Sequence, residues 1–167
     1  GGIISPTILV IALRGLEQSI QAAIPKGESV GTISYADDFV VTAKRKETLE
    51  KYVKPAIEAF LAQRGLQLSQ EKTKITHIAQ GFDFLGLTVR QLGAKVLSKP
   101  AKSRVKEFLC DIRKLIKSNR AVKTERLIYL LNQKITGWAN YYRFCAAKET
   151  FNDVDHSILK MLFQWIR

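Results

Sequence analysis

Apolar residues recur at regular intervals along most of the chain, and these intervals predict its elements. Residues 8–20 and 46–64 carry apolar side chains every three or four positions, as amphipathic helices do. Between these helices, residues 30–34 and 39–42 are rich in β-branched and apolar residues, which favours two strands joined by a tight turn. The expected helix over 46–64 contains Pro55, which lacks a backbone N–H and indicates a restart inside the helix.

The pattern changes at Lys99-Pro100. Before this point the chain has further strand-like segments. They cover residues 74–78, 82–90 and, more weakly, 95–97. After it the spacing is entirely helical, and three apolar stripes predict three helices. The stripes cover residues 105–116, 127–142 and 154–165, and the third helix is expected to begin at Thr150 as its N-cap. The sequence therefore predicts an α+β unit over residues 1–98 and a helical bundle over 99–167.

The distribution of charge along the chain indicates the class of molecule that the protein binds. The chain has 167 residues and a formal net charge of +12, most of it in one block. Residues 99–148 contain 13 Lys and Arg against 3 Asp and Glu (net +10), whereas residues 1–98 contain 12 against 9 (net +3) and residues 149–167 contain 2 against 3 (net −1). Concentrated positive charge favours a polyanion, so nucleic acid is the leading partner. A solvated lysine-rich face is the alternative.

The remaining composition indicates a protein that works inside a reducing compartment, in the bacterial cytoplasm or an organelle. Cys110 and Cys145 are too few for a zinc site or a disulfide framework, and both are interpreted as buried thiols. The apolar run over residues 3–13 is too short to span a bilayer, and it lacks the basic flank of a signal peptide. Because the chain opens without Met and closes in a helical pattern, we expect both ends to be cut from a longer protein.

The tetrapeptide Tyr35-Ala36-Asp37-Asp38 falls where the turn between the first two strands is expected. Two adjacent carboxylates repel each other unless a cation holds them. Hard oxygen ligands at a turn suit Mg²⁺, which usually keeps water and substrate phosphates as its other ligands. The pattern thus points to metal-assisted phosphoryl or nucleotidyl transfer. A solvated β-turn is the alternative, since Asp is a favoured turn residue.

Five segments of the chain, in the same order as in the family, resemble the reverse transcriptase/maturase proteins encoded by group II introns. GGIISPTILVIALRGLE resembles the stretch beneath the nascent base pair, and ISYADDFVV resembles the catalytic hairpin of the palm. GLQLSQEKTKI resembles the motif that follows, and GFDFLGLTVRQ the primer-grip hairpin. KITGWANYYRFCAAKETFNDVD resembles the maturase-specific helical domain, also called the thumb. The resemblance implies a partial palm over residues 1–98 and a thumb over 99–167.

The same resemblance implies roles for individual residues. Asp37 would be a ligand of Mg²⁺, Asp38 would be a second ligand or would orient the site, and Lys72 would lie near the nucleotide phosphates. The remaining positions would contact primer, template or nucleotide; they are Tyr35, Ala36, Gly2, Ser5, Pro6, Phe84, Leu85 and Gly86. Relatives usually have asparagine where this chain has Val10.

The family also supplies a metal-binding aspartate from an upstream strand. Glu17, in a helix, and Glu28, in a loop, are not suitable replacements, so we expect this chain to hold half of an active site. Trp138 and Tyr142 have the spacing of core residues, which leaves Tyr141 as the better aromatic candidate for RNA contact. The other predicted RNA-binding residues are the basic side chains Lys102, Arg104, Lys106, Arg113, Lys114, Lys117, Arg120, Lys123 and Arg126.

These features predict the palm and thumb part of an RNA-directed DNA polymerase that also binds group II intron RNA and assists its splicing. Its partners would be the intron RNA, an RNA template with a DNA primer, and a dNTP, with no membrane. Two alternatives stay open. The chain could be a non-catalytic RNA-binding splicing factor or remnant, or it could pair with a separate N-terminal reverse transcriptase half.

Overall fold

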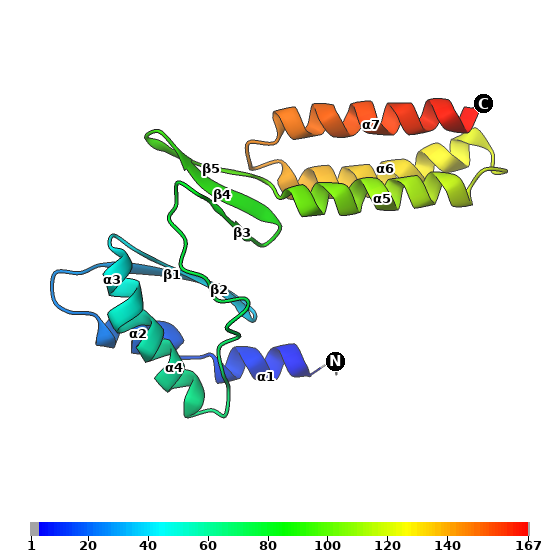
Figure 1. The fold of residues 1–167 in the computed structure, drawn as a ribbon. Coiled ribbons are helices and arrows are strands. Elements are labelled where there is room, and N and C mark those ends of the chain that lie inside the picture. The colour runs from blue at the N-terminus through cyan, green and yellow to red at the C-terminus, as the bar shows by residue number, and fades with distance from the viewer. Residues whose placement is uncertain (1–3, 167) are drawn as a thin grey trace. The chain divides into compact units, whose positions relative to one another are not determined.

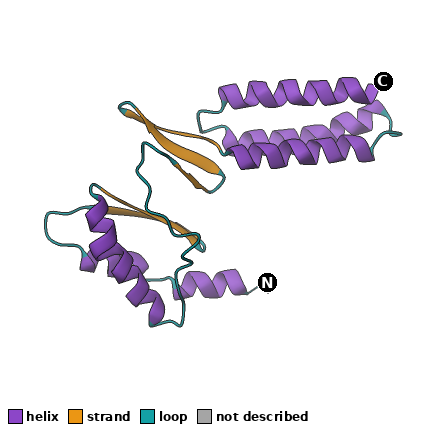
Figure 2. Cartoon of the chain, viewed as in Figure 1, coloured by secondary structure: helices purple, strands orange, loops and turns teal. Residues whose placement is uncertain are grey.

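The computed structural model describes residues 4–166, which form two compact units that divide between Thr76 and His77 (Figures 1 and 2). The first unit combines helices with a single hairpin, and the second combines a small antiparallel sheet with a bundle of three long helices. The expected α+β unit followed by a helical bundle is therefore confirmed. Within residues 4–166, no helix has both the length and the apolar character needed to cross a bilayer.

The first unit begins with two short helices rather than the single helix expected over 8–20. These are α1, Ser5–Ala12, and α2, Leu16–Ala23. The prediction of one helix was wrong because Gly15 has φ = 93°, a left-handed conformation that ends one helix and opens the next. Gly2 lies outside the described residues, whereas Ser5 and Pro6 open α1, where a missing proline N–H costs no helical hydrogen bond.

The expected hairpin follows as β1, Val30–Tyr35, and β2, Asp38–Ala43, paired antiparallel. The expected helix over 46–64 is then built from three segments. They are α3, Lys46–Thr48, the π-helical turn η1, Leu49–Val53, and α4, Lys54–Ala62. The restart at Pro55 is thus confirmed, and the π-turn directly precedes it. Ile20, Val53, Ile57 and Phe60 form the centre of this unit's core.

In the second unit three strands form a sheet of order β3-β4-β5, all antiparallel. They are β3, Phe82–Phe84, β4, Leu87–Leu92, and β5, Lys95–Pro100. The stretch 82–90 is thus a hairpin, with its turn at Leu85 and Gly86. The expected strand over 74–78 was wrong: this segment is a loop, because it finds no partner strand and Ile75 stays exposed.

Three helices complete the second unit. They are α5, Lys102–Ser118, α6, Thr124–Tyr142, and α7, Lys148–Ile166. Their buried faces meet in one core around Ile112, Leu127 and Leu131. The third helix begins two residues before the expected Thr150, and Phe151 N–H donates to Ala147 O at 2.8 Å in its first turn.

One further expectation, the burial of both cysteines, differs from the structure. Cys110 is exposed on α5, not buried; only Cys145 is partly covered. By their contacts, residues 77–98 form one compact unit with the helices. Sheet and bundle share direct links: Ala146 N–H donates to Ser98 O at 2.8 Å, and Lys99 pairs with Glu149 at 3.0 Å. Such long-range links are invisible in the spacing of apolar residues.

Candidate functional site

The tip of the β1–β2 hairpin displays the two candidate metal ligands. Tyr35 pairs with Asp38, so Ala36 and Asp37 form a two-residue turn. Of these two residues, only Ala36 has a positive φ (53°). This is the pattern of a type II′ turn, and the residue at this position of such a turn is normally glycine. A non-glycine residue in this region is uncommon, and such strain often accompanies functional sites. The turn therefore holds both carboxylates at the outermost point of the hairpin.

The side chains at this tip are available to a ligand. Tyr35 is 65% exposed, and Ala36, Asp37 and Asp38 are exposed as well. Neither carboxylate pairs with a cationic side chain within residues 4–166. The described part of the chain also contains no cluster of three or more His, Cys, Asp or Glu side chains that could enclose a metal ion. Two hard oxygen ligands fit part of a Mg²⁺ shell, with the other ligands coming from elsewhere.

The other acidic and basic candidates in the first unit form no ion pair with Asp37 or Asp38 in the described structure. Glu28 forms an ion pair with Arg45 and accepts a hydrogen bond from Thr48 Oγ1 at 3.0 Å, so its carboxylate is already occupied. Lys72 is exposed in the loop after α4 and forms no ion pair with Asp37 or Asp38 in the described structure. The structure thus brings together the four hairpin residues, and Lys72 forms no ion pair with their carboxylates within residues 4–166.

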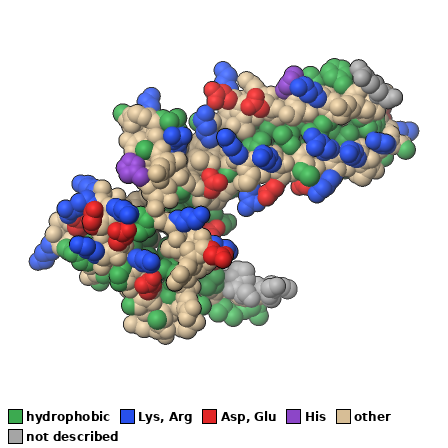
Figure 3. All heavy atoms as spheres, viewed as in Figure 1, with side chains coloured by type: hydrophobic (Ala, Val, Ile, Leu, Met, Phe, Trp, Pro, Cys, Tyr) green, Lys and Arg blue, Asp and Glu red, His purple; other side chains and the backbone are tan. Residues whose placement is uncertain are grey.

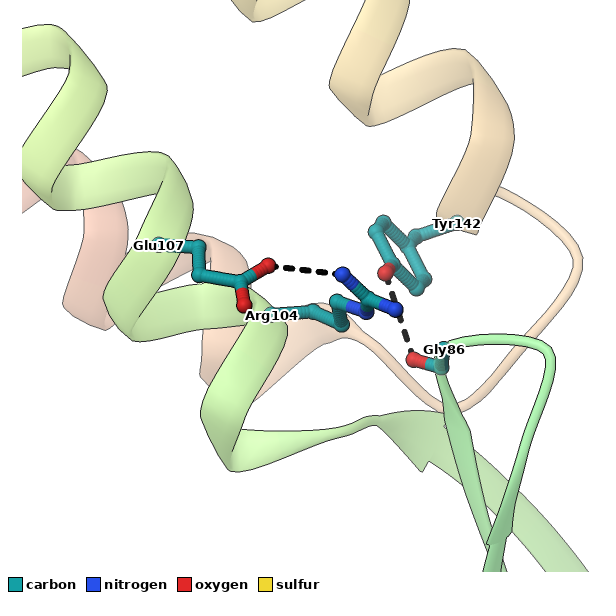
Figure 4. Close-up of polar contacts among 4 residues, drawn as sticks. All are labelled: Gly86, Arg104, Glu107 and Tyr142. Atoms are coloured by element: carbon teal, nitrogen blue, oxygen red, sulfur yellow. Dashed lines mark hydrogen bonds and ion pairs between the residues drawn. The ribbon is translucent and has the colours of Figure 1, made fainter. Parts of the chain in front are cut away.

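In the second unit, the turn between β3 and β4 is anchored to helix α6. Leu85 (φ = 49°) and Gly86 (φ = 74°) both have positive φ, as in a type I′ turn. Tyr141 Oη donates to Leu85 O at 2.7 Å, and Tyr142 Oη donates to Gly86 O at 3.2 Å (Figure 4). Gly86 O also accepts from Ala101 N–H at 2.9 Å. The turn that resembles a primer grip is therefore fixed through its own backbone carbonyls.

Close packing explains the glycine in this turn. A Cβ on Gly86 would lie 3.1 Å from Tyr142 Oη and 3.5 Å from Arg104 Cγ. Arg104 in turn donates to Glu107 at 2.8 Å, as Figure 4 shows, and this hydrogen bond raises the pKa of Arg104. Burial raises the pKa of Tyr142 above its ordinary value, so its hydroxyl remains a hydrogen-bond donor to a higher pH than an exposed tyrosine would. These contacts thus fix the β3–β4 turn to α5 and α6.

All the basic side chains predicted to bind RNA are exposed, and Figure 3 shows Lys and Arg gathered along the visible face of α5. Arg104 pairs with Glu107 and Lys114 lies 3.9 Å from Asp111, whereas the other predicted cations have no carboxylate partner within residues 4–166. Tyr141 is exposed, while Tyr142 is buried and Trp138 packs against the core, as the sequence predicted. Trp138 stacks on Phe108 with ring centroids 4.6 Å apart.

Sequence reasoning missed two features of this unit. Tyr142 was predicted only as a core residue, although its hydroxyl anchors the β3–β4 turn. Trp165 was assigned only to an apolar stripe, although it lines a hollow together with Arg113, Lys117 and Arg120. Arg113 and Lys117 lie four residues apart on one face of α5, and Arg120 follows three residues later in the turn after this helix. This spacing of basic residues was the signal that the sequence offered.

A hairpin that displays paired carboxylates, together with an anchored turn and a basic helical unit, has the parts of the palm and thumb of a nucleic-acid polymerase. Residues 1–89 match the family of reverse transcriptases (RNA-dependent DNA polymerases), and residues 105–167 match the group II intron maturase-specific domain. The chain therefore belongs to the reverse transcriptase family, in the group that carries the group II intron maturase domain. Reverse transcriptases generally use divalent metal ions.

The chain is also similar to two curated proteins. The Group II intron-encoded protein LtrA of Lactococcus lactis subsp. cremoris is 23% identical over 166 residues, covering 81% of this chain and 27% of the relative. The protein of the same name from strain MG1363 gives the same values. The chain thus spans about a quarter of the length of these relatives.

Proposed function

We propose that this chain supplies the catalytic hairpin, the primer grip and the RNA-binding thumb of a group II intron reverse transcriptase/maturase. The observation that carries this proposal is the hairpin tip, where Asp37 and Asp38 are exposed and free of cationic partners in the described structure, inside the segment that matches reverse transcriptases. A solvated turn would not need the strained Ala36. We also propose a domain boundary at residues 98/99, between the ends of the two family matches.

The proposed reaction is attack of a primer 3′-hydroxyl on the α-phosphate of a dNTP opposite an RNA template. Mg²⁺, when bound, neutralises charge that develops on the phosphates. Asp37 would be one of its ligands, and Asp38 would be a second or would orient the first. Tyr35 and Ala36 would form the floor beside the primer terminus, while Lys72 would neutralise the departing pyrophosphate.

Two other groups of residues would hold the substrates. Phe84, Leu85 and Gly86 would hold the primer strand. Their turn is fixed in position by hydrogen bonds from Tyr141 and Tyr142. Gly2, Ser5 and Pro6 would lie beneath the nascent base pair. The predicted RNA-binding cations on α5, on α6 and in the turn between them would contact intron RNA mainly through its phosphates, and so would support splicing.

A second candidate is an RNA-binding splicing factor without polymerase activity. It is favoured by the small number of acidic ligands: within residues 4–166 no cluster of three or more metal-binding side chains forms. A third candidate is one half of a split reverse transcriptase. In this case a separate chain would supply the further metal-binding aspartate, which also explains the small number of acidic ligands.

A primer-extension assay with Mg²⁺ and an RNA template separates these candidates. We expect no extension by this chain alone and extension after an upstream palm and fingers segment is added. Extension by the chain alone would contradict the view that it holds half of the active site. RNA binding without extension under either condition would instead support the splicing-factor candidate.

A further inference from the structure

A hollow between α5 and α7 in the second unit lies outside the proposed polymerase site. Its volume is about 290 Å³, close to the lower limit of about 300 Å³ for small-molecule sites. Its apolar lining comes from Ile116, Met161 and Trp165, of which Ile116 and Met161 are buried core residues. The hollow therefore has an apolar floor and room for one small group rather than for a duplex.

The rim of this hollow is basic. Arg113 and Lys117 line it from α5, Arg120 lines it from the turn after α5, and Gln164 lines it from α7. None of the three cations pairs with a carboxylate among the residues that the structure describes, in contrast to Arg104 and Lys114 on α5. Attraction to the carboxyl end of α5 favours cations there in any protein. That attraction does not account for an apolar hollow opening between them.

Trp165 is held in place at this hollow. Its Nε1–H donates to Asn119 O at 3.2 Å, and Asn119 Nδ2 donates to Leu115 O at 2.8 Å. With its only polar atom satisfied, the indole ring offers the hollow an apolar π-surface. Gln164 carries both a donor and an acceptor, the groups that read the edge of a nucleobase.

We propose that the α5–α7 hollow binds a single unpaired nucleotide of RNA, with its base against Trp165 and its flanking phosphates against Arg113, Lys117 and Arg120. This inference rests on the proposed RNA-binding function and adds a preference for a bulged or looped nucleotide over a continuous helix. Unpaired bases are the ones that proteins stack on aromatic side chains, because bases in A-form helices are inaccessible to such contact.

Binding of two matched RNAs to the whole chain tests the proposal. One RNA is a hairpin with a single-nucleotide bulge, and the other is the same hairpin fully paired; both carry a fluorophore for anisotropy at one fixed salt concentration. We expect the bulged RNA to bind about tenfold more tightly, the factor that stacking of one base provides. Trp165→Leu is expected to remove this preference, and Trp165→Phe, which retains an aromatic ring, is expected to retain most of it.

A charge-matched pair of variants separates the hollow from the general basic surface. Lys117→Gln removes a cation at the rim, and Lys114→Gln removes one from the same helix outside the hollow. Both variants should weaken binding of the paired hairpin equally, whereas Lys117→Gln alone should also reduce the preference for the bulge. Circular dichroism melting checks that each variant is folded. The Lys117 and Lys114 pair keeps the test decisive if Trp165→Leu unfolds, because neither lysine belongs to the core.

The outcomes separate this inference from the function on which it rests. Equal binding of bulged and paired hairpins by the unmodified chain would overturn the nucleotide site but leave RNA binding intact. Failure of both RNAs to bind at low salt would contradict the proposed RNA-binding function itself. A preference for the bulge that survives both Trp165→Leu and Lys117→Gln would place the nucleotide elsewhere and would also overturn the proposal.

Discussion

Asp37 contributes exposed charge rather than packing, so its role can be tested without unfolding the protein. Asp37→Asn preserves shape and removes one carboxylate. In the protein supplemented with its upstream segment, we expect primer extension to fall more than about 100-fold, because even the partners of metal ligands are worth about 10- to 100-fold. RNA affinity should change less than about twofold, since the hairpin carries few phosphate contacts in this proposal.

Asp155→Asn is the matched control for this substitution, since Asp155 is an exposed aspartate on α7 without an ion pair among the described residues. It should leave extension unchanged. A large loss of RNA affinity in Asp37→Asn would contradict the separation of catalytic hairpin and RNA-binding helices.

Gly86 offers a second test at the scale of single residues, with Gly93 as its control. Both have positive φ, but a Cβ on Gly93 would meet nothing within 4 Å, whereas one on Gly86 would press on Tyr142 Oη. Gly93→Ala should lower the free energy of unfolding by about 1–2 kcal/mol through backbone conformation alone. Gly86→Ala should cost a further 0.5–1.5 kcal/mol or so, the value of a disturbed hydrogen bond. Urea unfolding followed by circular dichroism measures both.

Gly86→Ala is expected to lower the free energy of unfolding more than Gly93→Ala does. Measuring Gly86→Ala again in a Tyr142→Phe background shows how much of this extra loss comes from the Tyr142 hydroxyl. If the extra cost of Gly86→Ala is the same with and without the hydroxyl, the contact between Gly86 and Tyr142 is not its cause.

The two cysteines should differ in reactivity. Cys110 is exposed, whereas Cys145 is partly buried, its thiol donates to Tyr142 O at 3.0 Å, and burial raises its pKa. Because the thiolate is the reactive form, Cys145 should be alkylated more slowly than Cys110 by iodoacetamide near pH 8. Mass spectrometry of native protein over time measures both rates. Faster labelling of Cys145 would mean that the end of α6 is open in solution.

At the scale of elements, the sequence predicted most helices because their apolar faces are long and strictly periodic. The apolar stripe over residues 105–116 lies within α5, Lys102–Ser118, and the stripe over residues 127–142 lies within α6, Thr124–Tyr142. The failures have local causes. The positive φ of Gly15 divides the periodic stretch over residues 8–20 into two helices, which the spacing of apolar side chains does not indicate. Residues 74–78 have the composition of a strand but do not pair with another strand in the described structure.

The candidate site was predictable to the extent that it is local in sequence. The acidic hairpin needs only two neighbouring strands and a turn, so its register follows from residues 30–43. The anchoring of Gly86 by Tyr142 joins residues 56 positions apart, and no pattern in the sequence reports it. The roles assigned to Lys72 and the hairpin acids remain predictions.

At the scale of the whole molecule, we expect the uneven distribution of charge to be the main determinant of the proposed RNA binding. Replacing Lys102, Lys106 and Lys123 with Gln should flatten the dependence of log K on log salt, by about 0.7–0.9 for each phosphate that is no longer neutralised. The matched control replaces Lys26, Lys44 and Lys51, which lie outside the basic block and are also exposed. Filter binding at several salt concentrations gives the slopes. Equal slopes in the two triple variants would mean that net charge, not the basic block, determines binding.

The hydrogen bonds that fix the β3–β4 turn accept at main-chain oxygens, and this has a consequence for evolution and engineering. Because these bonds do not involve the side chain at position 85, other residues there should leave the turn anchored to α6, whereas a side chain at Gly86 would press on Tyr142 Oη. Leu85 itself occupies a backbone region that Asn and Gly tolerate better. A library at this position should therefore be enriched in Asn and Gly when selected for thermostability.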